Sequence, residues 1–197
     1  TRPHLDPAVE LTTDASSVLT DPAIDIIVEV MGGIEPARQY ITTALEHGKH
    51  VVTANKDLMA LCGYELFSAA QEHNKNIYYE ASVGGGIPLI RPIKHCLAAN
   101  RIRSIMGIIN GTTNYILTQM TTAKKDFQDA LAEAQAKGFA EADPSSDLEG
   151  RDAAYKLAIL AGLAFQSIVK VEQIATESIV EVSVRDIMYA DELGFVI

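Results

Sequence analysis

The first half of the chain alternates short apolar runs with amphipathic segments. The apolar runs are rich in β-branched residues and predict buried strands at residues 24–30, 49–54 and 76–82. Apolar positions at helical spacing predict helices over residues 36–47 and 57–72, and a further helix near Pro88. Strands that alternate with helices are typical of a parallel sheet with helices on its faces, so this half has an α/β pattern.

The pattern changes after about residue 100. The expected elements there are a strand over residues 101–111, helices over residues 113–120 and 126–138, a helix that carries Lys156, a strand or extended connection over residues 168–178, and a helix over residues 184–193. Gly138 is the expected C-cap of its helix, and Asp147 the expected N-cap of the Lys156 helix. We therefore predict an α+β second domain, with the domains at residues 1–92 and 93–197.

Composition narrows the class of partner. The 197 residues are 48% hydrophobic and 21% charged, and their formal net charge is -10. Because no run of Lys or Arg offsets this charge, nucleic acid and anionic membrane surfaces are not expected partners. The sequence has no apolar stretch long enough to cross a bilayer and no signal peptide pattern. Two cysteines in unrelated contexts are neither a disulfide framework nor a zinc pattern, which favours a cytoplasmic location.

A dense acidic cluster stands before the most apolar helix. The stretch "EADPSSDLEGRDAAYKLAIL" holds five acids, then one lysine, then an apolar run. Asp152 and Lys156 are four residues apart and so share a helix face. One interpretation is a surface ion pair. The other is a partly desolvated lysine that serves as a proton donor, with Glu141 and Asp147 either holding a cationic substrate group or capping and solvating the helix.

Three further residues lie at the carboxyl ends of two predicted strands. Lys56 follows "VVTAN", and Met31 and Gly32 follow "IDIIVEV". Ligands bind at this edge of parallel sheets, although a solvated helix start also explains Lys56. The strand–GxGxxG signature of a dinucleotide site does not occur, which predicts a piece of a longer protein or a domain that does not bind dinucleotide alone.

The glycine-rich turn in "YEASVGGGIP" leaves three interpretations open. It is a phosphate cradle, a plain tight turn, or a site at which Glu80 and turn carbonyls bind a hard cation. In "GIINGTTNYILT", Thr112 to Asn114 are expected to cap a helix, with a substrate contact as the alternative.

Together these motifs resemble a known family. The stretches "IDIIVEVMGG", "VVTANK", "YEASVGGGIPLI", "GIINGTTNYIL" and "GFAEADPSSDLEGRDAAYKLAIL" occur in the order and at the spacings of homoserine dehydrogenases. The resemblance runs from about residue 25 to residue 194, and the last motif is the most specific. It implies reduction of L-aspartate 4-semialdehyde to L-homoserine with NADH or NADPH. It also implies an incomplete Rossmann-like nucleotide-binding domain followed by a catalytic and dimerisation domain, and a homodimer.

The resemblance assigns roles residue by residue. Lys156 matches the proton donor to the aldehyde oxygen, and Asp152 the residue that positions it. Glu141 and Asp147 match ligands of the substrate's ammonium group. The remaining substrate contacts that it implies are Lys56 and Thr112. The implied cofactor contacts are Met31, Gly32, Lys56 and Gly138. The implied monovalent-cation site, usually sodium, consists of Glu80 and the carbonyls of Val83, Gly85 and Ile87.

The chain departs from the family pattern at both ends. The N-terminal strand with its glycine motif and the C-terminal segment of the nucleotide domain are missing, and with them the residue that selects NADP or NAD. Two alternatives to a dehydrogenase of aspartate semialdehyde therefore stay open. One is a non-catalytic dimerisation or interaction fragment of such an enzyme. The other is a dehydrogenase for another amino-acid semialdehyde.

Overall fold

The chain divides into two compact units. The computed structural model describes residue 6 and residues 9–197; one unit ends at Tyr79 and the other runs from Glu80 to Ile197. Residues 1–5 and 7–8 of the predicted domain 1–92 lie outside the described residues. Residues 80–92, which the sequence pattern placed in the first domain, belong to the second unit. The reason is local, because the Glu80 carboxylate accepts hydrogen bonds from the backbone of residues 89–91.

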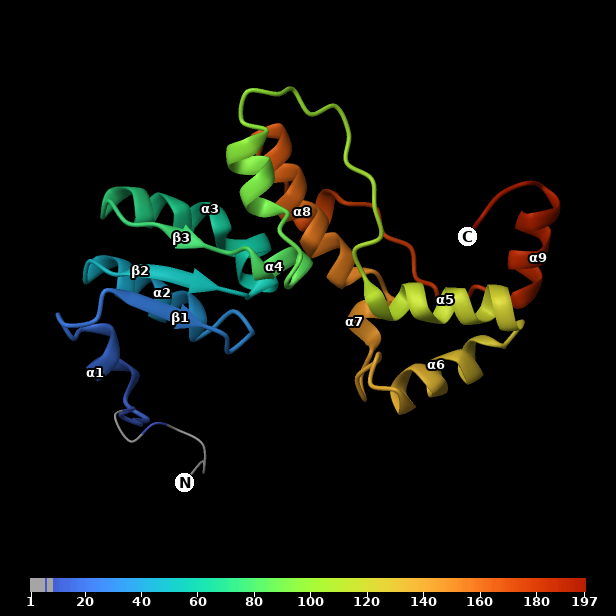
Figure 1. Cartoon of the computed structure of the whole chain (residues 1–197), viewed down its shortest axis with the longest axis horizontal. Coiled ribbons are helices and arrows are strands. Elements are labelled where there is room, and N and C mark those ends of the chain that lie inside the picture. Colours follow the sequence, from blue (N-terminus) through green and yellow to red (C-terminus); the bar gives the residue numbers. More distant parts are fainter. Residues whose placement is uncertain (1–5, 7–8) are drawn as a thin grey trace. The chain divides into compact units, whose positions relative to one another are not determined.

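The first unit is built on a three-stranded parallel sheet in the order β1-β2-β3 (Figure 1). The strands are β1 (Ile26–Glu29), β2 (His50–Thr53) and β3 (Ile77–Tyr78). All three predicted strands are therefore confirmed. The third is shorter than expected because the chain enters helix α4 (Ala81–Gly84) three residues after it ends.

Two of the helices of the first unit follow the predicted bounds. These are α2 (Ala37–Glu46) and α3 (Lys56–Glu72). Pro36 precedes the first, and Gly48 follows it in the left-handed region that favours glycine. A short helix that the pattern did not predict, α1 (Ala15–Leu19), begins where Asp14 accepts a hydrogen bond from the amide of Ser16.

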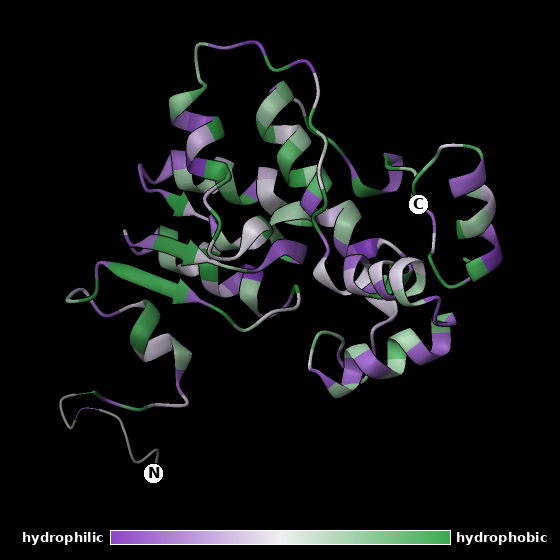
Figure 2. Cartoon of the chain, turned by 45° about the vertical axis from the view of Figure 1, so that its right-hand side comes forward, coloured by the Kyte–Doolittle hydropathy of each residue, from purple (hydrophilic) through white to green (hydrophobic). Residues whose placement is uncertain are grey.

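One face of the sheet carries the core of this unit. Successive strand residues point to opposite faces. Val51 and Ile77 are buried, and α2 packs against β1 and β2. Val28, Val52 and Tyr78 are exposed on the other face, so both faces of the sheet carry hydrophobic residues. The strands are accordingly coloured as hydrophobic over much of their length in Figure 2.

The second unit is helical. Its helices are α4, the π-helix η1 (Pro92–Cys96), α5 (Gly111–Ala123), α6 (Phe127–Ala136), α7 (Ser145–Leu148), α8 (Arg151–Phe165), the 3-10 helix η2 (Val171–Gln173) and α9 (Val184–Glu192). The predicted helices around residues 113–120, 126–138, 156 and 184–193 are confirmed. The helix expected near Pro88 is helical only from Ile90 and continues as η1. Buried residues of α5, α6, α7 and α9, together with Ala140 of the loop after α6, form a core cluster: Ile116, Met120, Phe127, Ala130, Ala134, Ala140, Leu148 and Ile187.

The predicted strand at residues 101–111 is wrong. In Figure 1 the chain from η1 to α5 is a loop, and residues 101–110 pair with no strand in the part of the chain that the structure describes. Met106 is 96% exposed and Ile108 is 78% exposed. An apolar, β-branched run becomes a strand only where a neighbour completes the backbone ladder, which a local pattern cannot supply. Residues 168–178 likewise form an extended connection that contains η2.

Two capping predictions are also wrong. Asp147 lies inside α7, and α8 begins instead after Gly150, which has a φ of 80°. Helix α5 is capped by Asn110 rather than by residues 112–114, because the Asn110 side chain accepts from the amide of Thr113. In both places a polar side chain that was expected to cap a helix has a tertiary partner.

Candidate active site

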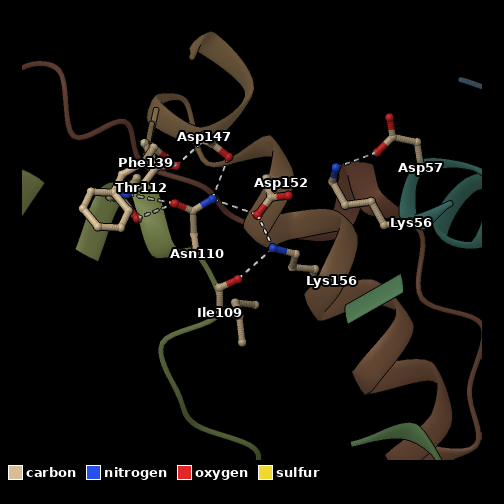
Figure 3. Close-up of polar contacts among 10 residues, drawn as sticks. Lys56, Asp57, Ile109, Asn110, Thr112, Phe139, Asp147, Asp152 and Lys156 are labelled. Carbon is tan, nitrogen blue, oxygen red and sulfur yellow. Dashed lines mark hydrogen bonds and ion pairs between the residues drawn. The ribbon is translucent and has the colours of Figure 1, made fainter. Parts of the chain in front are cut away.

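The predicted pair on α8 is formed and is largely buried. Lys156 Nζ donates to Asp152 Oδ2 at 2.7 Å, and the two side chains are 16% and 7% exposed (Figure 3). Lys156 Nζ also donates to the carbonyl of Ile109 at 2.9 Å. An ammonium has three donors, so one is available to an acceptor in the cleft beside it. The pair is thus largely buried and is not a surface ion pair.

Asn110 joins the two aspartates of the site. Its amide nitrogen donates to Asp147 Oδ1 at 2.7 Å and to Asp152 Oδ2 at 2.8 Å (Figure 3). Its amide oxygen accepts from the backbone and the hydroxyl of Thr113. All four hydrogen-bonding positions of a buried asparagine are therefore used, and the orientation of the amide is determined by its partners.

Thr112 completes the cluster from the first turn of α5. Its hydroxyl lies 2.9 Å from Asp147 Oδ2 and 2.9 Å from the carbonyl oxygen of Phe139. The Phe139 ring packs against the ring of Tyr115 with centroids 4.6 Å apart. The loop that follows α6 is consequently held over the start of α5.

These side chains surround one cleft of about 530 Å³. Its lining residues are Asn110, Gly111, Thr112, Asn114, Tyr115, Thr118, Gly138, Phe139, Asp147, Asp152 and Lys156. Among the residues predicted from the sequence, the structure brings Thr112, Gly138, Asp147, Asp152 and Lys156 together here. Glu141 is exposed and is not among the lining residues, so its predicted role has no geometric support.

The predicted residues of the first unit form a separate, smaller cleft of about 220 Å³. It lies between the carboxyl ends of β1 and β2 and is lined by Val30, Met31, Gly32, Ala54, Asn55, Lys56 and Asp57. Lys56 Nζ is 3.7 Å from Asp57 Oδ1, a contact longer than a hydrogen bond. The positions predicted from the two strand ends therefore do share one cleft.

Glu80 binds backbone amides in this structure. Its Oε1 accepts from Leu89 and Ile90 at 2.5 and 2.8 Å, and its Oε2 accepts from Arg91 at 2.8 Å. Burial acts to raise the pKa of this carboxyl, but the three amide donors outweigh it and the net pKa is lowered. The group is therefore ionised at neutral pH, and Oε2, which accepts a hydrogen bond from the Arg91 amide, has lone-pair capacity for a cation.

The turn after Glu80 has oxygens to offer as well. The carbonyls of Val83, Gly85 and Ile87 accept none of the backbone hydrogen bonds that the described residues make outside helices and strands. Three carbonyl oxygens and one carboxylate oxygen are ligands that fit a hard monovalent cation. No group of three or more His, Cys, Asp and Glu side chains that could hold a metal occurs among the described residues.

Sequence reasoning missed two residues, Asn110 and Glu29. Asn110 has a sequence signal, because an asparagine directly before "GTT" and an apolar helix is a common N-cap. Glu29 is a charged residue at the end of an apolar strand, and it is buried. Its contacts to Met31 and Thr53 are visible only in the folded chain.

Two family models together match almost the whole chain. The model described as "Homoserine dehydrogenase, NAD binding domain" matches residues 2–80, and the model described as "Homoserine dehydrogenase" matches residues 88–197. The chain is 56% identical over 194 residues to a homoserine dehydrogenase of Synechocystis sp., and 49% identical over 189 residues to one of Bacillus subtilis. These alignments cover 98% and 96% of this chain, but 45% and 44% of the two relatives. The chain thus spans about half the length of the curated relatives that it matches.

Solved structures give the same result. A crystal structure of a homoserine dehydrogenase from Thiobacillus denitrificans superposes with a TM-score of 0.91 at 49% identity, and covers 95% of this chain and 43% of that one. A hyperthermophilic archaeal homoserine dehydrogenase in complex with NADPH superposes with a TM-score of 0.72 at 34% identity, and covers 80% of this chain and 48% of that one. No helix among the described residues is long and apolar enough to cross a membrane.

Proposed function

Because the chain belongs to the homoserine dehydrogenase family, we propose that the protein containing it reduces L-aspartate 4-semialdehyde to L-homoserine with NADH or NADPH. The observation that carries the proposal is the hydrogen-bonded cluster of Asp147, Asn110, Asp152 and Lys156 in one cleft, in which Asn110 and Asp152 are buried and the other two are half-buried. The comparisons favour this function over an interaction fragment or a dehydrogenase of another semialdehyde.

Lys156 is the proposed proton donor. Hydride addition leaves negative charge on the former carbonyl oxygen, and that oxygen takes a proton from Nζ. Asp152 and the Ile109 carbonyl each accept a hydrogen bond from Nζ. These two bonds fix the orientation of the ammonium group and therefore the direction of its third N–H. The lysine is left neutral and regains its proton from solvent, to which its side chain is 16% exposed. General acid catalysis is typically worth about 10² to 10⁴ in rate.

Asp147 and Thr112 are the proposed substrate contacts in the same cleft. Asn110 and Thr112 each use one lone pair of the Asp147 carboxylate, and about two of its four positions remain for an ammonium group. Glu141 and Lys56 complete the proposed substrate contacts. The acidic side of the cleft suits the amino end of the substrate, and the lysine suits its reacting oxygen.

Met31, Gly32, Lys56 and Gly138 are the proposed cofactor contacts. When bound, the dinucleotide supplies the hydride. The turn at Met31 and Gly32 lies at the carboxyl end of a parallel strand, the edge at which such sheets bind ligands. Gly32 lacks a Cβ and has open space around it, so backbone can approach a ligand closely there.

A sodium ion is the proposed occupant of the site of Glu80, Val83, Gly85 and Ile87. Two observations support this proposal. The Glu80 carboxylate has a lowered pKa. The three turn carbonyls accept none of the hydrogen bonds that described backbone amides make outside helices and strands. Soaking crystals with thallium or rubidium should give a density peak at this turn. Water alone, at hydrogen-bonding distances, would count against the cation.

The remaining proposals concern assembly and location. We propose a cytoplasmic homodimer that assembles through the part of the chain after residue 92. The support is the set of apolar residues exposed on the second unit, among them Met106 and Ile108. A sedimentation measurement at a protein concentration of tens of micromolar tests the dimer. A monomer at that concentration would contradict it.

The direct test of the proposed function is an assay of the full-length protein. Aspartate semialdehyde should cause oxidation of NADPH or NADH, followed by the absorbance of the reduced cofactor, and homoserine should be the product by mass spectrometry. Glutamate semialdehyde, one methylene longer, is the matched control substrate. Equal turnover of both semialdehydes, or of neither, would contradict the proposal.

A further inference from the structure

A buried polar network joins the carboxyl ends of β1 and β2. Glu29 and Thr53 are register partners on the buried face of the sheet, where they are 5% and 2% exposed. The Thr53 hydroxyl donates to Glu29 Oε2 at 2.6 Å. A glutamate at the end of an apolar strand is costly to bury unless its oxygens are hydrogen-bonded, so the purpose of this residue must be sought in its partners.

The other carboxylate oxygen of Glu29 holds the turn that follows β1. Glu29 Oε1 accepts from the amide of Met31 at 2.7 Å and, at a longer distance of 3.4 Å, from the amide of Gly32. Gly32 and Gly33 have φ values of 79° and 73°, where the backbone leaves the strand geometry. The carboxylate thus supplies to these amides the acceptor that the strand ladder no longer provides.

The same network continues to the start of α3. Thr53 Oγ1 accepts from the amide of Asn55 at 3.0 Å, and Asn55 is 6% exposed. The Asn55 amide nitrogen donates to the carbonyl of Gly33 at 2.6 Å, and its amide oxygen accepts from Leu58 to cap the helix. A closed set of hydrogen bonds therefore couples the turn after β1 to the helix that begins at Lys56.

We propose that Glu29 is a positioning residue for dinucleotide binding, which acts by holding the Met31–Gly32 turn directly and the start of α3 through Thr53 and Asn55. The inference rests on the proposed function, because Met31, Gly32 and Lys56 are its cofactor contacts. Glu29 itself is buried, and both of its oxygens are used within the network. Its effect on the cofactor is therefore indirect, through the geometry of the cleft between the two strand ends.

The test uses the full-length protein with the variants Glu29→Gln and Thr53→Val, which weaken the network at either end. Thr53→Ser keeps the hydroxyl, and Glu72→Gln changes an exposed glutamate at the end of α3 as the matched control. Dissociation constants for NADPH and NADH come from fluorescence titration, and amide hydrogen exchange reports on residues 31–33. Loss of one hydrogen bond to a charged group corresponds to about a tenfold change in an equilibrium constant.

We expect Glu29→Gln and Thr53→Val to speed amide exchange in the turn, and to raise the dissociation constant and the cofactor KM by about tenfold, with little change in kcat at saturation. Thr53→Ser and Glu72→Gln should match the wild type. Unchanged cofactor affinity in both variants, even with a lower Tm, would overturn the positioning role and leave the proposed function intact. Failure of the wild-type protein to bind either dinucleotide would overturn the proposed function and the positioning role together. Thr53→Val still reports on the network if Glu29→Gln does not fold.

Discussion

Two lysine–carboxylate clusters in the second unit have similar chemistry and different surroundings. In the first, Lys156 pairs with Asp152 in a cleft where both side chains are mostly buried. In the second, Glu133 is shared by Lys125 and Lys137 on α6 and its flanks, and the Lys137 side chain is 53% exposed. Tyr115 donates to Glu133 as well, so the second cluster is no less connected than the first.

The two clusters differ in how far their charged side chains are exposed to solvent. Water and salt screen the exposed ion pairs around Glu133, so they contribute little beyond the packing of α5 on α6. The buried pair has lost that screening. Asp152 depends on Lys156 and Asn110, and Lys156 depends on Asp152 and the Ile109 carbonyl. The number of ion pairs is thus a poor guide to function, and burial beside a cleft is the better one.

Removing Lys156 should have the largest effect. In the full-length protein, Lys156→Ala should lower kcat by about 10² to 10⁴ because it removes the proton donor, while cofactor binding stays close to wild type. Lys156→Arg keeps a charge for Asp152 but should not restore turnover, because a guanidinium stays protonated at working pH. Steady-state kinetics, with folding checked by circular dichroism, gives the answer. Lys137→Ala, in the exposed cluster, is the matched control and should keep near wild-type kcat.

Equal turnover in Lys156→Ala and Lys137→Ala would contradict the functional difference between the buried pair and the exposed cluster around Glu133. Lys156 would then be only an ion-pair partner of Asp152. The proton donor would have to be sought at Lys56 or in a bound water.

Removing Asn110 should have the next largest effect, on stability. Asn110→Ala removes one hydrogen-bond donor from each of Asp147 and Asp152, which keep Thr112 and Lys156 as donors, and it removes the cap of α5. We expect a loss of roughly 1–3 kcal/mol in the free energy of unfolding, measured by urea denaturation. Asn114→Ala, an exposed position in the first turn of the same helix, should change it by at most about 0.5 kcal/mol. Equal losses in the two variants would show that the amide bridge contributes nothing specific.

Glu141 tests whether an exposed carboxylate acts at the cleft. Glu141→Gln removes the charge proposed to face the substrate ammonium, so KM for aspartate semialdehyde should rise by about tenfold with kcat nearly unchanged. Glu149→Gln, an exposed acid that pairs with Arg151, is the control. If KM is the same in both variants, Glu141 belongs with the solvated acids, as its exposure in this structure indicates.

The smallest effect is expected in the exposed cluster, and it depends on pH. Hydrogen bonds from Lys125, then Lys137, then Tyr115 lower the pKa of Glu133 from 4.5 to about 2. Because the folded-state pKa is the lower one, its stabilising contribution is present above about pH 4.5 and is lost as the pH falls toward 2. Wild type should therefore lose its stability advantage over Glu133→Gln across that range, measured by Tm against pH, while kcat is unchanged at neutral pH. A Tm difference that is constant with pH would contradict the assignment.

The sequence alone determined the elements whose signals are local. Apolar periodicity and the residues Pro36, Gly48 and Gly138 placed the strands of the first unit and most of the helices, because they depend on spacing and on backbone conformation within a few residues. The i,i+4 spacing also placed Asp152 and Lys156 on one face of α8. The family followed from motif order in the same way.

Only the tertiary structure decided what surrounds those elements. The Asn110 bridge spans 37 and 42 residues to its two aspartates, and the bond from Thr53 to Glu29 spans 24. Whether residues 101–111 form a strand depended on a neighbouring strand that the described chain does not provide. The physical reason is the same in each case: burial and hydrogen-bond partners come from segments distant in the sequence, and they decide whether a charged or apolar residue is functional, structural or exposed.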